Sequence, residues 1–292
     1  MTDSDRLRQK VSRHPFGFSL PPDDVVRGDA WVPDSPVEGT AIVILHGFKG
    51  FKDWGFFPYV CEEIAAQTGS VTVSFNCTGS GVGDSLDQFD ELDRFATNTF
   101  TRELQDLEAV LDRLSAGRLG EIQMTPAHRF GLLGHSRGGA ISLLAASRRT
   151  QVTALITWNS VASLTRYADM HAPKWEAGET VYILNARTGQ QMPLARNLMD
   201  DVRANRSRLD VIAATKSLTA PYLVIHGEAD EAVPVSEAEL LVSASGIHGT
   251  LVLIEGAGHT FGAVHPFAGS NHRLDRVLKL SVGHFEHFLV GD

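Results

Sequence analysis

Six short apolar segments recur along the chain, and they constrain its fold more than any other feature. They are residues 40–45, 71–75, 130–133, 154–158, 221–225 and 250–254. The first of them, Thr40–Leu45, is a continuous apolar run after its threonine, as is typical of a strand that is buried on both faces. Stretches with helical periodicity lie between them, the clearest at 99–114, where one face carries Leu104, Leu107, Val110, Leu111 and Leu114. This alternation predicts an α/β fold: a mostly parallel twisted sheet with helices on both faces.

Two parts of the chain do not follow this alternation of strands and helices: the N-terminal residues and a segment in the second half. Residues 16–33 alternate between apolar and polar side chains, which predicts an antiparallel hairpin at a sheet edge, whereas the polar residues 1–15 predict a loosely packed terminus. The alternation stops at 160–218, where we expect only a helical end near 198–214. We therefore expect a core made of residues 1–159 and 219–292, and a small cap insertion at 160–218.

The composition of the chain restricts the kinds of molecule that it is expected to bind. The 292 residues carry a net charge of −9 without a long basic run, so neither nucleic acid nor an anionic membrane is an expected partner. The polar N-terminus lacks the apolar core of a secretory signal, and no apolar run approaches the ~20 residues that span a bilayer. Cys61 and Cys77 both lie in apolar segments, which favours free buried thiols over a disulfide. We expect a cytoplasmic protein.

Gly134, Ser136 and Gly138 form a G-x-S-x-G pattern between a predicted strand and a predicted helix. Glycines are needed there because a serine on a sharp strand-to-helix turn presses its neighbours against adjacent backbone. The pattern predicts a nucleophilic Ser136, with the backbone N–H of Arg137 as an oxyanion donor. An ordinary glycine-rich turn with a helix-capping serine is the alternative.

A serine nucleophile needs a base and an orienting carboxylate, and two loops downstream supply candidates in the order acid, then histidine. Asp230 is the predicted acid, ahead of its loop neighbours Glu228 and Glu231, because the loop backbone can fix its short side chain. His259 is the predicted base, because it follows a buried strand and has Gly258 and Gly262 nearby. His265 and His272 are the rival histidines, and an acidic surface loop is the alternative for Asp230.

Two further loops follow buried strands. The segment His46-Gly47-Phe48 occupies the place of the second oxyanion donor, which we assign to the backbone N–H of Phe48. The glycine-rich segment 79–83 has no clear helix start at its end and no phosphate-binding lysine, so we expect no nucleotide cofactor there but a loop crossing the strand ends. No histidine, cysteine or carboxylate spacing predicts a metal site, and we expect no cofactor.

Taken together, the motifs at Gly134–Gly139, His46–Phe48, Asp230–Pro234 and Gly258–His259 resemble those of the α/β-hydrolase superfamily. Within it, residues 185–190 and 259–262 resemble the feruloyl/cinnamoyl esterase branch, near the dienelactone-hydrolase and prolyl-oligopeptidase-like groups. The resemblance implies hydrolysis of small, often aromatic, acyl esters beneath a short cap. Dienelactone hydrolases use a cysteine nucleophile, so Ser136 argues against that activity.

The sequence thus predicts a serine esterase that cleaves small carboxylic esters through an acyl-enzyme, with feruloyl and cinnamoyl esters as the narrower candidates. The expected partner is a small-molecule ester, bound by Phe48, His135, Trp175, Tyr182 and Met192, with Arg187 nearby. A peptidase or acyltransferase using the same triad, and a non-catalytic binding protein of the same fold, are the alternatives. The oligomeric state stays open, with a homodimer as one candidate.

Overall fold

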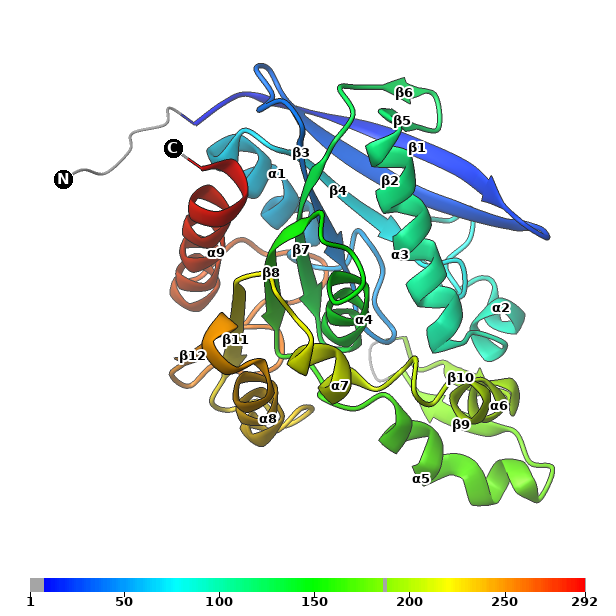
Figure 1. Cartoon of the computed structure of the whole chain (residues 1–292). Helices are drawn as coiled ribbons and strands as arrows, with labels where there is room; N and C mark the ends of the chain where they lie inside the picture. The colour runs from blue at the N-terminus through cyan, green and yellow to red at the C-terminus, as the bar shows by residue number, and fades with distance from the viewer. Residues whose placement is uncertain (1–7, 186–187, 292) are drawn as a thin grey trace.

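The computed structural model describes residues 8–185 and 188–291. Within these residues, eight strands form one sheet in the order β1-β2-β4-β3-β7-β8-β11-β12 (Figure 1). All neighbours from β4 to β12 pair in parallel, whereas β1 and β2 form an antiparallel edge. The strands are β1 (Val11–Leu20), β2 (Asp24–Pro33), β3 (Thr40–Leu45), β4 (Val71–Asn76), β7 (Arg129–His135), β8 (Val152–Trp158), β11 (Tyr222–Gly227) and β12 (Gly249–Ile254). The predicted α/β fold is confirmed.

The edge hairpin is also confirmed, but it starts earlier than predicted. Val11 pairs with Pro33, so β1 includes residues 11–15, which we expected to be loosely packed. The prediction was wrong there because these polar residues form backbone hydrogen bonds with β2, and their own pattern does not reveal that pairing. Residues 1–7 of the predicted loose terminus lie outside the described residues.

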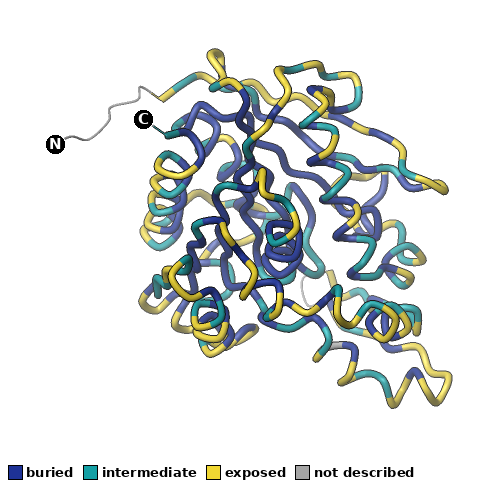
Figure 2. The backbone as a smooth tube through the Cα atoms, viewed as in Figure 1, coloured by how far each residue is buried: buried dark blue, intermediate teal, exposed yellow. Residues whose placement is uncertain are grey.

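Helices cover both faces of the sheet (Figure 1). One apolar cluster joins the sheet to α1 (Phe57–Thr68) and α9 (His272–Phe285), which continues as a π-helical turn, η2 (Glu286–Val290). The other joins it to α3 (Phe100–Ser115), α4 (Arg137–Ala146) and α8 (Val235–Ser245). The predicted leucine face of α3 is fully buried, and each such side chain contributes about 1.5–3 kcal/mol relative to an exposed one. Figure 2 shows the buried strands inside exposed helix faces.

Smaller elements connect these layers. They are α2 (Leu92–Ala96), the two-residue strands β5 (Arg118–Leu119) and β6 (Ile122–Gln123), and η1 (Gly246–His248). Cys61 and Cys77 are free and buried, as predicted. Among the helices of the described residues, none combines the length and the apolar character needed to cross a membrane.

Residues 160–218, which we predicted to be an insert, contain more regular structure than their sequence predicts. They contain α5 (Thr165–Glu176), the antiparallel pair β9 (Val181–Leu184) and β10 (Gln191–Leu194), α6 (Asn197–Ala204) and α7 (Val211–Lys216). The expected helical end at 198–214 is two helices, and Asp210 caps the second by accepting a bond from the Ala213 N–H (2.9 Å). The insert meets the core beside α2, where the Ala195 N–H donates to the Ala96 carbonyl (2.9 Å).

Candidate active site

The turn between β7 and α4 holds Ser136 in a strained conformation. Its φ is 56° and its ψ −122°, values that residues with a Cβ rarely adopt. The Ser136 N–H donates to the Trp158 carbonyl (2.8 Å), which ties the turn to β8. A Cβ on Gly134 would lie 2.3 Å from the Gly138 oxygen, and one on Gly138 would lie 2.3 Å from the His46 oxygen. The two glycines therefore allow the close packing that presents the serine.

His46 fixes the loop beside this turn. Its Nδ1 lies 2.9 Å from the Gly47 oxygen, and its Nε2 accepts a hydrogen bond from the Cys77 N–H (3.3 Å). Burial lowers the pKa of His46 to about 4, so the ring is neutral and can donate through Nδ1 while it accepts through Nε2. His46 thereby joins the loop of Phe48 to Cys77, the first residue after β4.

Asp230 and His259 form a hydrogen-bonded pair. The Nδ1–H of His259 donates to Oδ2 of Asp230 (2.8 Å), while Oδ1 accepts from the N–H groups of Ala232 (2.8 Å) and Val233 (2.9 Å). Burial acts to raise the pKa of Asp230, but these hydrogen bonds, led by the one from His259, outweigh it and lower the pKa. Asp230 is thus a buried, ionised carboxylate that orients the imidazole.

Two buried side chains hold the backbone carbonyl group of His259. His135 Nε2 lies 2.8 Å from the His259 oxygen, and the Asn159 amide donates to the same oxygen (2.7 Å). The Asn159 Oδ1 accepts from the Gly227 N–H (2.7 Å), so one amide bridges the loop after β11 and the loop after β12. Burial lowers the pKa of His135 to about 3, which keeps that ring neutral beside His259.

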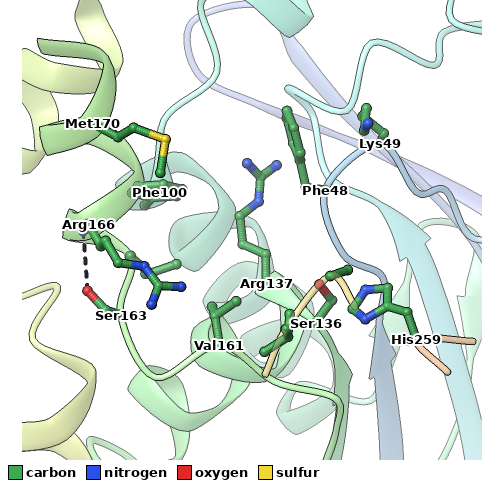
Figure 3. Close-up of a pocket in the computed structure, with 13 residues that line it drawn as sticks. Phe48, Lys49, Phe100, Ser136, Arg137, Val161, Ser163, Arg166, Met170 and His259 are labelled. Atoms are coloured by element: carbon green, nitrogen blue, oxygen red, sulfur yellow. Dashed lines mark hydrogen bonds between the residues drawn. The ribbon is translucent and has the colours of Figure 1, made fainter. Parts of the chain in front are cut away.

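Two adjoining cavities meet at Ser136 and His259, and both are also lined by Phe48 and Lys49. The larger lobe, of about 450 Å³, continues between α3, α4 and α5 along Phe100, Arg137, Val161, Leu164, Arg166 and Met170. The smaller lobe, of about 250 Å³, continues along Gly50, Trp54, Phe57, His135, Asn185 and Thr260. Figure 3 shows the imidazole of His259 beside the Ser136 hydroxyl at the larger lobe. A ligand spanning both lobes would pass over these two side chains.

The structure brings most of the predicted site residues together. Ser136, His259, Arg137 and Phe48 line the larger lobe, and Asp230 lies behind His259. Arg137 is the first residue of α4, so its N–H has no acceptor within the helix.

Three predicted substrate-binding residues do not line either lobe. Trp175 and Met192 are fully buried inside the insert, where the Trp175 indole donates to the Leu194 carbonyl (2.9 Å). Tyr182 is 60% exposed on β9. Trp175 and Met192 are used for the packing of the insert itself, which sequence alone does not distinguish from a pocket wall, whereas Val161, Leu164 and Met170 of the insert do line the larger lobe. His135 does line the smaller lobe. Arg187 lies outside the described residues.

Sequence reasoning missed Asn159 and Arg166. Asn159 directly follows a predicted buried strand, as the predicted catalytic side chains do, and that position is the signal that could have identified it. Arg166 lies on α5, which was not predicted, and no motif marks it.

The comparisons with known proteins agree with this architecture. A model of the alpha/beta hydrolase family matches residues 42–271. No curated protein sequence matches the chain.

Solved structures share the fold at low sequence identity. Est1E from Butyrivibrio proteoclasticus with bound ferulic acid has a TM-score of 0.67 and 22% identity, over 89% of this chain and 94% of that one. A dienelactone hydrolase from Anabaena variabilis has a TM-score of 0.61 and 17% identity, over 96% and 99% of the two chains. The acylaminoacyl peptidase of Pyrococcus horikoshii has a TM-score of 0.65 and 19% identity, over 98% of this chain and 43% of that one. With the family match covering most of its length, the chain belongs to the alpha/beta hydrolase family.

Proposed function

We propose that the protein is a serine esterase that cleaves small carboxylic esters through an acyl-enzyme. The observation that carries this proposal is the order Ser136, His259, Asp230: the first two line one cavity, and the third holds the imidazole at 2.8 Å. This is the arrangement that a serine needs in order to act as a nucleophile near neutral pH.

The proposed reaction has two halves. The Oγ of Ser136 attacks the ester carbonyl while His259 Nε2 takes its proton, and the N–H groups of Phe48 and Arg137 bind the resulting oxyanion. Collapse of this intermediate breaks the bond to the alcohol, which leaves with the proton from His259. A water molecule then gives a proton to His259 and attacks the acyl group. The bond between the acyl carbon and Oγ of Ser136 breaks, Oγ takes the proton back from His259, and the carboxylic acid leaves.

Two lobes on either side of the reacting groups suit an ester, because its acyl and alcohol parts extend in different directions from the carbonyl. The larger lobe has the size of a small-ligand site and has apolar walls at Phe100, Val161 and Met170. Aromatic acyl groups fit this description, and feruloyl and cinnamoyl esters are the narrower proposal. The insert, which supplies Val161 and Met170, is proposed to act as the cap.

Labelling with a fluorophosphonate tests the nucleophile. We expect labelling of the wild-type protein and of Ser270→Ala, an exposed serine used as the matched control, but none of Ser136→Ala. Ester cleavage should fall at least about 10⁴-fold in Ser136→Ala with the fold retained. Labelling that persists in Ser136→Ala would refute the assignment.

A substrate panel tests the reaction class. Methyl ferulate and short-chain p-nitrophenyl esters should be cleaved, whereas p-nitroanilides of the same acyl groups should be cleaved far more slowly. A preference for the anilides would instead favour a peptidase.

A further inference from the structure

The charged side chains that line the larger lobe are all cationic. Lys49, Arg137 and Arg166 line it, and none of the described lining residues is acidic. The N-terminus of α4, a helix of ten residues, adds its positive end at Ser136. Lys49 donates to the Leu184 carbonyl (3.2 Å), and a neutral ester offers no anionic group to the two guanidinium groups.

The first guanidinium, that of Arg137, is held rigidly. Its Nη2 lies 2.6 Å from Oε1 of Glu103, and its centre lies 4.5 Å from the ring of Phe48 and 5.6 Å from that of Phe100. Figure 3 shows the guanidinium standing between the two rings. The side chain of Glu103 is 6% exposed and lies outside the cavity lining, so the carboxylate orients Arg137 from behind.

The second guanidinium, that of Arg166, is arranged in the same way. It pairs through Nη1 with Oε1 of Glu237, whose other oxygen accepts a bond from the Ala162 N–H (2.6 Å). The side chain of Glu237 is only 5% exposed, whereas that of Arg166 is 56% exposed. The remaining N–H groups of Arg166 are thus accessible, and Figure 3 shows its side chain extending from α5 across the lobe toward Val161, while the guanidinium of Arg137 points toward Phe48.

We propose, building on the esterase function above, that the larger lobe binds a carboxylate through Arg137 and Arg166, so that the preferred substrates are esters bearing a free carboxylate. Guanidinium groups are suited to this because their planar donors match a carboxylate. The apolar side chains of Phe100, Val161 and Met170 would contact the methylene chain or ring between the carboxylate and the ester. The carboxylate belongs either to the acyl chain, as in a half-ester of a dicarboxylic acid, or to the alcohol.

Matched substrate pairs test the charge preference. Monomethyl adipate is compared with methyl hexanoate for a carboxylate on the acyl side, and 6-acetoxyhexanoate with hexyl acetate for one on the alcohol side. We expect kcat/KM to be about tenfold or more higher for the charged member of one pair, the effect of a hydrogen bond between charged groups. Which pair shows it identifies the side.

Variants then test the residues. The double variant R166Q/E237Q removes the cation together with its buried partner, so that no carboxylate is left unpaired, and it should bring the charged-to-neutral ratio close to one. Arg166→Lys should keep part of the preference, because it keeps the charge but loses the planar donors. Arg196→Gln, on an exposed arginine of the same insert that lines neither lobe, should leave the ratio unchanged.

Binding to the Ser136→Ala variant, measured by calorimetry with monomethyl adipate and 6-acetoxyhexanoate, separates this inference from the proposed function. Binding that requires the carboxylate and Arg166, without cleavage of any ester by the wild type, would support the carboxylate site and refute the esterase. Cleavage of the neutral esters with no charge preference would refute the carboxylate site alone. A preference that survives in R166Q/E237Q would also overturn it, as would the absence of both binding and cleavage.

Discussion

Replacing Arg137 by Met tests how strongly the buried pair with Glu103 is coupled. The Met side chain fills similar space but leaves the carboxylate of Glu103, 6% exposed, without its cation. Breaking a buried ion pair from one side costs about 3–5 kcal/mol, and lost contacts of the cation with Phe48 and Phe100 add about 1 kcal/mol. At about 2 °C per kcal/mol for a large domain, the midpoint of thermal unfolding should fall by roughly 8–12 °C.

The reverse change should cost less. In Glu103→Gln the arginine keeps access to water through the larger lobe, so we expect about 1–3 kcal/mol. The double variant R137M/E103Q removes both charges and should be more stable than R137M alone, because a buried pair replaced by neutral groups is often nearly neutral in free energy. Urea unfolding of all four proteins gives the coupling free energy from a double-mutant cycle.

The pH dependence gives an independent check. Burial raises the pKa of Glu103 even though Arg137 and Asn98 oppose it, and removing Arg137 should raise it further. A carboxyl group whose folded pKa lies above its unfolded value favours the folded state most below the unfolded pKa and loses this contribution as pH rises through the folded pKa. The destabilisation of R137M should therefore be larger at pH 8 than at pH 5. A coupling below about 1 kcal/mol, or a loss independent of pH, would refute the reasoning.

Three further changes test the proposed acid, the packing of the turn at Ser136, and a buried carboxyl group on α3. Asp230→Asn should lower kcat about 10⁴-fold with little change in the unfolding midpoint, because the amide favours the wrong imidazole tautomer; steady-state kinetics showing under tenfold loss would exclude Asp230 as the acid. Gly138→Ala should destroy activity and reduce stability, since its Cβ would lie 2.3 Å from the His46 oxygen. Thermal unfolding followed by circular dichroism and an ester-cleavage assay check this, and wild-type stability and activity in the variant would contradict the observed packing. Burial raises the pKa of Asp106 to about 7, so the contribution of Asp106 to stability falls as pH rises from about 4 to 7. Asp106→Asn keeps an acceptor for the Thr78 N–H and should make the unfolding midpoint depend less on pH in this range. An unchanged pH dependence of the midpoint would contradict this prediction.

The sheet could be predicted from sequence because its signals are local. The central strands β3, β4, β7, β8 and β11 are buried along nearly all of their length and are mainly apolar, whereas the edge strand β12 is only partly buried. The Gly134 and Gly138 positions are dictated by contacts with backbone only a few residues or one strand away. The positions of the proposed acid, Asp230, and the proposed base, His259, could be predicted because each follows a strand, and parallel strands end at one edge of the sheet. Neither inference required knowledge of how distant side chains pack.

The insert could not be predicted in the same way, because some of its side chains pack inside the insert and others line the cavity. Trp175 and Met192 are residue types that often line pockets. In this insert, however, both are fully buried, because they form its own apolar core. The residue of the insert that brings charge to the cavity is Arg166, whose partner Glu237 comes from α8, far along the chain. In this insert Trp175 therefore marks the core of the insert itself, and Arg166, with Glu237 behind it, is the residue from which we infer what the cavity binds.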